Sequence, residues 1–339
     1  NGAPFKECVT HGWTVDGEGK AMHKSLGNGV DPADVTSKWG ADVLRLWVAS
    51  ADYAQDVSIS DNILKQVSDA YRRFRNTFRF LLGNLSDFDD QANAVANWDD
   101  LEPIDQYMMA KTAQLLSDVE QAYDSFKFNG VYRAVYDFVN DLSSVYMDVT
   151  KDRLYSESPD SPRRRAVQTV LFNILEVLVR VLSPILSFTA DEVWECYPEA
   201  MRNREGRVCN VQLAGWPHRS DFVPALPGKA AEDKVLAAFG GALEVRDVVT
   251  KALEDARGAK VINKSQEATV SVTAPQATLD ALSAFDASVF EELFIVSGVT
   301  FAAGNELACE VKPAEGDKCP RCWNYRQLGE NERHPAVCR

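Results

Sequence analysis

Apolar side chains recur every three or four residues through the middle of the chain. Stripes with this spacing are typical of amphipathic helices that turn one face toward a core. The first and last residues of the stripes are Ile63 and Leu82, Ile104 and Tyr123, Tyr132 and Val149, and Val167 and Leu182. The pattern predicts a mainly α fold with a helical bundle over residues 61–216.

Local signals predict where several of these helices begin or end. Gly83 follows the first stripe as a C-cap. Pro162 stands where a long helix is expected to start. Thr189 and Glu192 have the spacing of a capping box, which predicts the start of a shorter helix.

Residues 1–60 contain shorter patterns. Val9 to Trp13 is a β-prone run, and Asp16-Gly17 is a turn signal. Pro32 directly follows Asp31, a pairing typical of a helix start. We therefore expect a strand, a turn, a loop and short helices here.

The last third of the chain changes character at a proline-rich stretch, residues 217–228, which predicts a linker. A small α/β domain is expected over residues 229–311, followed by a polar tail over 312–339. Its elements are a helix to Arg257, a strand with Ala268, Val270 and Val272, a helix over Leu279–Phe285 and a strand over Phe294–Phe301.

Length and composition indicate a globular protein of several domains. The chain has 339 residues, of which 45% are hydrophobic and 25% charged. The longest apolar run includes Glu176 and Arg180, so it predicts a buried helix and no membrane span. The first residues lack the features of a signal peptide and an initiator Met, so we expect the sequence to begin within a longer protein.

Cysteines and net charge restrict the location and the partners. Seven cysteines without regular spacing argue against a disulfide framework and favour the cytoplasm. A formal net charge of −14 opposes nonspecific binding to nucleic acid, because the field of the whole molecule repels phosphates. Any RNA site must then be a local basic patch.

The segment GEGKAMHKSLGN, residues 17–28, combines glycines, two lysines and a serine after the predicted strand. Glycines let backbone amides approach an anion, and a lysine ammonium supplies positive charge for a polyphosphate. The composition alone is equally compatible with a solvated basic turn.

The same segment resembles the KMSKS signature of class I aminoacyl-tRNA synthetases, in particular the isoleucyl branch. Lys24 and Ser25 match the signature, whereas Ala21 and His23 replace its first lysine and its first serine. The resemblance implies that Lys24 and Ser25 are catalytic and that Lys24 stabilises the departing pyrophosphate. It implies an ATP loop formed by Lys20, Met22, His23 and Lys24, with Lys20 in part replacing the missing lysine.

The resemblance continues through residues 40–60, 70–85 and 252–268. It implies the end of a Rossmann-type catalytic domain with a stem-contact fold in residues 1–60, then a helical anticodon-binding domain. The implied partners are ATP with Mg²⁺, tRNA(Ile), and isoleucine bound by a region upstream. Because the HIGH motif and the editing domain are absent from this sequence, we expect this segment alone to be inactive. We also expect a monomer.

Cys319 and Cys322 form a C-x-x-C pair, and Cys338 follows after fifteen intervening residues. This is close to the spacing of a four-cysteine zinc site. The alternative is a pair of unliganded core thiols, but the flanking residues are polar rather than typical of a core. The resemblance implies a structural zinc in a terminal module. His334 is a candidate for the fourth ligand.

Two further groups are candidates for RNA contact. Arg72, Arg75 and Arg79 share one face of the first long helix, where they either contact phosphates, pair with acids or are solvated. Trp323 stands among the cations Lys318, Arg321 and Arg326, as base stacking requires, or else packs over the metal knuckle.

Two alternatives stay open at this level. A noncatalytic tRNA-binding zinc module would share the terminal segments, and a valyl, leucyl or methionyl relative would share the signature loop and the bundle. The cysteine module and the segment AKVINKSQEA favour the isoleucyl branch.

Overall fold

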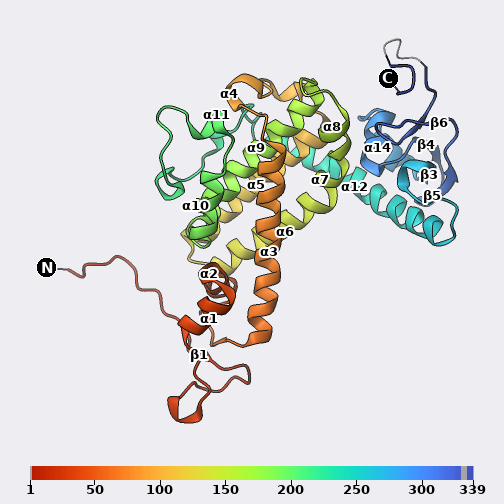
Figure 1. The fold of residues 1–339 in the computed structure, drawn as a ribbon. Coiled ribbons are helices and arrows are strands. Elements are labelled where there is room, and N and C mark those ends of the chain that lie inside the picture. The colour runs from red at the N-terminus through yellow and green to blue at the C-terminus, as the bar shows by residue number, and fades with distance from the viewer. Residues whose placement is uncertain (1, 330–333, 339) are drawn as a thin grey trace. The chain divides into compact units, whose positions relative to one another are not determined.

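The chain is mainly helical in the computed structural model, which describes residues 2–329 and 334–338 (Figure 1). Residue contacts divide it into two compact units. The first comprises residues 1–93, 112–143 and 171–222, and the second comprises 94–111, 144–170 and 223–339. The sequence instead suggested boundaries at 60, 216, 228 and 311, and these functional domains stay a prediction.

The helices and the short π-helical turn η3 occupy the following ranges, in chain order: α1 Pro32–Trp39, α2 Ala41–Ser50, α3 Asp61–Asn84, α4 Asp90–Asn93, α5 Pro103–Asp124, α6 Phe128–Asp141, η3 Leu142–Tyr146, α7 Met147–Val149, α8 Lys151–Ser156, α9 Pro162–Leu182, α10 Ser187–Glu195, α11 Glu199–Arg202, α12 Lys229–Gly258, α13 Gln276–Leu282 and α14 Ala287–Phe294. In the described part of the chain, none of the helices has the length and apolar character needed to span a membrane.

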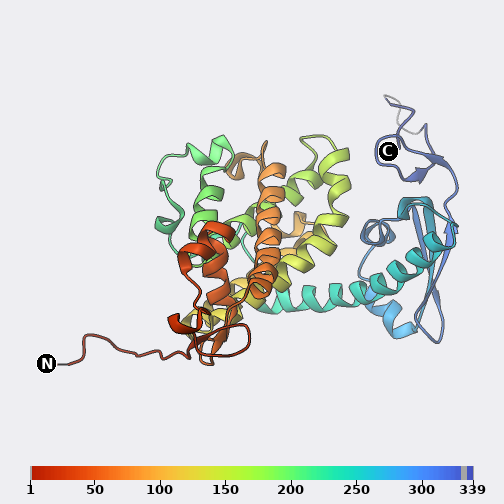
Figure 2. The same ribbon diagram turned by 60° about the horizontal axis from the view of Figure 1, so that its bottom comes forward.

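The first unit has its core between α2, α3, α6 and α10, which Figure 2 shows from a second side. Phe74 on α3 meets the rings of Tyr132 and Tyr136 on α6 edge to face, each at 6.4 Å between centroids. The α3 stripe is buried as its periodicity predicts, and the helix continues to Asn84. Gly83 is therefore not the C-cap, because Leu85 takes that position and donates its backbone N–H to Leu81 O.

A short parallel pair of strands precedes these helices. β1 (Thr14–Val15) pairs with β2 (Val57–Ser58). The strand begins after the predicted run Val9–Trp13, whose Val9 and Trp13 side chains are exposed, so that run was wrong in position. The predicted helix start at Pro32 is confirmed, since Asp31 caps α1 by accepting the Ala33 backbone N–H at 2.8 Å.

The capping-box prediction for Thr189 and Glu192 was wrong, because α10 already begins at Ser187. The Thr189 backbone N–H and Oγ1 both donate to the buried carboxylate of Asp42, at 2.7 and 2.6 Å. A tertiary contact to α2 thus takes the place of the local cap. Glu192 is engaged elsewhere, as described below.

The second unit contains a three-stranded sheet with the order β4-β3-β5. β3 (Ala268–Ala274) is central, with β4 (Gly298–Ala303) parallel to it and β5 (Ala308–Pro313) antiparallel. Alternate residues of β3 are buried, as its sequence predicts. The parallel pairing needs a crossover, and α13 and α14 supply it.

Two boundaries in this unit differ from the sequence prediction. The helix expected over Leu279–Phe285 is α13, which ends at Leu282. Phe294 ends α14 and is buried with Phe290 and Leu293 at helical spacing, so the predicted strand does not begin until Gly298. The tail adds a small antiparallel pair, β6 (Asp317–Lys318) with β7 (Tyr325–Arg326).

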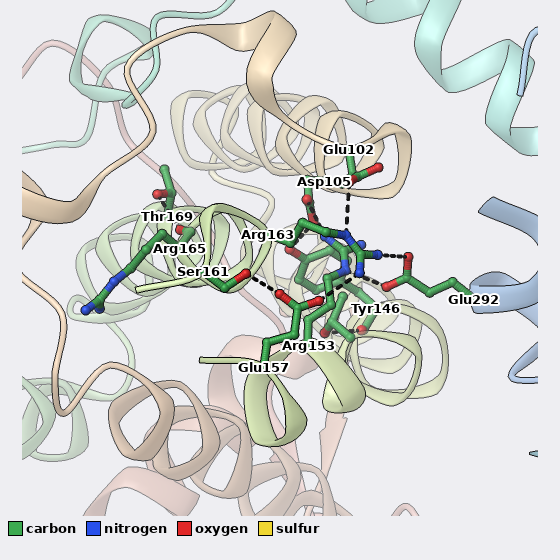
Figure 3. Close-up of polar contacts among 11 residues, drawn as sticks. Glu102, Asp105, Tyr146, Arg153, Glu157, Ser161, Arg163, Arg165, Thr169 and Glu292 are labelled. Atoms are coloured by element: carbon green, nitrogen blue, oxygen red, sulfur yellow. Dashed lines mark hydrogen bonds and ion pairs between the residues drawn. The ribbon is translucent and has the colours of Figure 1, made fainter. Parts of the chain in front are cut away.

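A buried ion network joins several helices of the second unit (Figure 3). Arg153 on α8 is 1% exposed and donates to Asp105 on α5 at 2.7 Å and to Glu292 on α14. Arg163 on α9 donates to the other oxygen of Glu292 at 2.9 Å. Tyr146 completes the network by donating its hydroxyl to Asp105 at 2.7 Å.

Candidate nucleotide loop, zinc knuckle and nucleic-acid surfaces

The candidate nucleotide loop extends from the end of β1 through the short 3₁₀ helix η1 (Lys24–Leu26). Ser25 and His23 are exposed, and Met22 is half-buried. The Lys20 ammonium lies 2.7 Å from Glu18 in an exposed ion pair. The Lys24 side chain lies outside what the structure describes, although its backbone is placed at the start of η1.

The loop closes on itself through backbone and side-chain bonds. Asp16 N–H donates to Lys20 O at 2.9 Å, and Val15 forms an antiparallel bridge with Ala21. This confirms the turn predicted at Asp16-Gly17. Residues 20–25 therefore lie on one loop, with Asp16 at its base, and the described side chains of Lys20, Ala21, His23 and Ser25 are exposed.

The three predicted zinc ligands come together. The sulfurs of Cys319, Cys322 and Cys338 all lie within 4.8 Å of one another, and Cys322 Sγ is 3.4 Å from Cys338 Sγ. A Zn–S bond of about 2.3 Å separates tetrahedral sulfurs by about 3.8 Å, so the three sulfurs fit one zinc ion. His334 is exposed and is not a member of this cluster among the described residues.

The knuckle backbone favours a thiolate at Cys319. Burial opposes ionisation of this thiol, but backbone N–H groups of Cys322, Cys338 and Arg321 outweigh it and lower the pKa of Cys319 to about 7. Burial raises the pKa of Cys322 to about 12. A bound cation would favour the thiolate form of every ligand, because metal binding displaces the thiol proton.

The arginine stripe on α3 has three different environments. Arg75 forms a two-bond ion pair with Glu192 of α10, with both N–O distances at 2.7 Å, and this pair raises the pKa of Arg75. Arg72 lies 3.3 Å from Asp69. Arg79 is exposed and has no hydrogen-bond or ion-pair partner within the described part of the chain. It lines a cleft of about 350 Å³ with Arg75 and residues of α10.

The Trp323 ring is 48% exposed and has cations beside it. The ammonium of Lys264 lies 4.1 Å from the ring centre, and that of Lys318 lies 5.5 Å away. The other predicted neighbours have different partners, since Arg321 donates to Ser156 O and Arg326 pairs with Glu291 at 2.7 Å. Trp323, Lys264 and Lys318 form what we call the knuckle patch.

Lys264 was missed as a site residue by the sequence analysis. It lies 55 residues before Cys319 in the sequence, and no local spacing connects it to Trp323. The only signal in the sequence was its position in AKVINKSQEA, one of the segments that carries the resemblance. The fold brings it to the ring, because the segment leads into β3, which begins at Ala268 and belongs to the same unit as the knuckle.

Three family models match separate parts of the chain. The "tRNA synthetases class I (I, L, M and V)" model matches residues 1–60. The "Anticodon-binding domain of tRNA ligase" model matches residues 105–272, and "Zinc finger found in FPG and IleRS" matches residues 316–339. The loop, the helices and the knuckle are thus each similar to a part found in tRNA synthetases, and residues 1–60 are similar to those of class I.

Curated relatives narrow the family. Isoleucine–tRNA ligase of Geobacillus thermodenitrificans is 46% identical over 350 residues, and that of Symbiobacterium thermophilum is 42% identical over 353. Each alignment covers 99% of this chain and 36% of the relative, so the chain spans about a third of their length. The chain corresponds to the C-terminal portion of isoleucine–tRNA ligases.

Proposed function

We propose that the chain is the tRNA-binding and ATP-loop portion of an enzyme that activates isoleucine with ATP and transfers it to tRNA(Ile). The observation that carries this proposal is the match of the whole chain to isoleucine–tRNA ligases. The exposed loop of residues 20–25 and the three-sulfur knuckle support it. Isoleucine would bind upstream of this segment, and the enzyme would act in the cytoplasm.

In this proposal, the loop acts on the phosphates of ATP held with Mg²⁺. Lys24 stabilises the negative charge that develops as pyrophosphate leaves, and Ser25 donates a hydrogen bond to the same phosphates. Lys20 has a lesser role, because its ammonium is already paired with Glu18. The missing first lysine of the signature thus has only a partial replacement.

The second part of the proposal concerns tRNA. Arg79 contacts a backbone phosphate, since it is the exposed member of the stripe without an acidic partner. Trp323 stacks on an unpaired base, with Lys264 and Lys318 attracting the adjacent phosphates. Both sites are local cationic patches on a chain whose net charge is −14.

Lys24→Ala in the complete enzyme tests the proposal. Isoleucine-dependent pyrophosphate exchange should slow by roughly 100- to 1,000-fold, because removal of one oxyanion donor costs about that much in rate. The affinity for tRNA should not change. Lys38→Ala removes a lysine outside the loop, paired with Asp61, and should leave the exchange rate unaltered. A Lys24→Ala rate within threefold of wild type would refute the ATP role of the loop.

A further inference from the structure

The carboxylate of Asp16 accepts hydrogen bonds from several groups of the nucleotide loop. It directly follows β1, and its Oδ1 accepts the backbone N–H groups of Glu18 at 3.0 Å and Lys20 at 2.9 Å. Its Oδ2 accepts a hydrogen bond from the side-chain amide of Asn28 at 2.8 Å. The bond from Asn28 is the largest of the effects that lower the pKa of Asp16, which keeps the carboxylate ionised.

The side-chain amide of Asn28 bonds to the backbone of the residues just before Lys24. Its Nδ2 also donates to Ala21 O at 3.2 Å, and its Oδ1 accepts the backbone N–H of His23 at 2.9 Å. Between them, the two side chains bond to the backbone of Lys20, Ala21 and His23. These residues immediately precede Lys24, so the pair restrains the backbone from which Lys24 extends.

The residues on either side of Asp16 are restrained by contacts with the segment that leads into α3. Val15, the residue before Asp16, is buried and accepts the Ile59 backbone N–H at 3.0 Å. Gly17 lies against Ser60, where an added Cβ would come 3.0 Å from the Ser60 Cβ. Ser60 is the N-cap of α3. Asp16 therefore stands on a segment fixed to the start of a long helix, whereas the residues it holds are exposed.

We propose that Asp16 and Asn28 are positioning residues that set the loop for phosphate binding. The inference rests on the proposed ATP role of this loop. Neither side chain needs to touch ATP. Displacement of a catalytic group by about 1 Å can lower the reaction rate by about 100-fold. Restraint of the backbone before Lys24 should therefore raise the rate of the chemical step.

Three variants in the complete enzyme test the pair. Asn28→Asp places two carboxylates together and breaks the bond between the side chains. Asp16→Asn leaves one acceptor oxygen in place of two, so either the backbone N–H groups of Glu18 and Lys20 or the amide of Asn28 lose their acceptor. The double variant Asp16→Asn with Asn28→Asp restores a donor facing an acceptor. Each single variant should lower kcat for pyrophosphate exchange by about 10- to 100-fold, and the double variant should recover at least part of that loss.

A cycle with Lys24→Ala separates positioning from a general effect on folding. If Asn28 acts through Lys24, Asn28→Ala should cost less than about threefold once Lys24 is already alanine. The affinity for tRNA should be unchanged in every variant, since neither Arg79 nor the knuckle patch is altered. Independent, multiplicative losses, or single variants with wild-type kcat, would overturn the positioning role. A Lys24→Ala variant with a normal exchange rate would instead refute the function on which this inference rests.

Discussion

Arg75 and Arg79 lie one turn apart on α3, but their guanidinium groups differ in whether an acidic side chain pairs with them. Arg75 is held by both oxygens of Glu192, so contact with a phosphate would require the loss of a two-bond ion pair. Arg79 has no such partner among the described residues. Its charge is available without that loss, which makes it the stronger candidate for phosphate contact.

Arg79→Ala in the complete enzyme should weaken binding of tRNA and lower the slope of log K against log salt by about 0.7 to 0.9, which corresponds to one phosphate contact. Arg75→Ala is the matched control from the same face. It should leave the slope unaltered and change the free energy of unfolding by no more than about 1 kcal/mol, because the pair is about half exposed. Filter binding at several salt concentrations gives both slopes. If Arg75→Ala lowered the slope more than Arg79→Ala, the phosphate contact would belong to Arg75 and the prediction would be wrong.

At the scale of single residues, the sequence predicted which residues carry the site chemistry better than it predicted which side chains contact them. Cys319, Cys322 and Cys338 were predicted together because metal ligands have characteristic spacing. The spacing of the arginines on α3 predicted a shared face, but it could not predict that Glu192 of α10 pairs with one of them. Lys264 was not predictable for the same reason, because its approach to Trp323 depends on tertiary structure.

At the scale of elements, periodicity predicted α3 and α9 well, because each carries a long apolar stripe, and Pro162 marked the start of α9. It failed where short signals competed. Thr189 has the sequence of a cap, but Asp42 takes its hydrogen bonds. The run from Phe294 was assigned to a strand because apolar residues at the end of α14 directly precede β4.

The ion network of the second unit is another feature that helical periodicity could not predict. Asp105 and Arg153 are 0% and 1% exposed, so both charges have been removed from water. Burial of an ion pair costs desolvation free energy, and the pair offsets that cost only while both partners remain. The network thus connects α5, α8, α9 and α14 through charges that must be kept together (Figure 3).

Asp105→Ala should therefore destabilise this unit strongly, by about 3 to 5 kcal/mol, because it leaves the guanidinium of Arg153 buried beside the unpaired Tyr146 hydroxyl. Chemical denaturation followed by circular dichroism measures this change. Glu102→Ala removes an acid that lies 3.2 Å from Arg163 but is about a third exposed, and it should cost no more than about 1 kcal/mol. Equal costs for the two variants would show that burial does not control the strength of these pairs.

At the scale of the whole molecule, net charge and RNA binding act in opposite directions. A net charge of −14 repels phosphates at long range, so binding of tRNA must depend on a few local cationic sites. In the proposed function the knuckle patch is one such site, and the three clustered cysteines are part of its framework. Trp323 has a positive φ of 67° and donates its backbone N–H to Cys319 O at 2.9 Å, so its position depends on the turn between two ligands.

Cys319→Ser should then remove zinc and weaken binding of tRNA together. Loss of one base stack costs about 1 to 3 kcal/mol, which corresponds to about 5- to 150-fold in affinity. Trp323→Ala should retain zinc and lose a similar factor, and the double variant should bind no worse than Cys319→Ser alone, because both changes abolish the same contact. Metal analysis and filter binding with the complete enzyme measure the two effects.

The helical signal in circular dichroism should be unchanged in Cys319→Ser, since the knuckle contains no α-helix within the part of the chain that is described. Cys309→Ser is the matched control, because Cys309 lies on β5 outside the sulfur cluster and should keep both zinc and tRNA affinity. Full zinc content in Cys319→Ser would exclude this thiol as a ligand. If Cys319→Ser and Trp323→Ala reduced affinity by independent factors, the metal would stabilise some other RNA contact, and the knuckle patch would not be the surface that zinc organises.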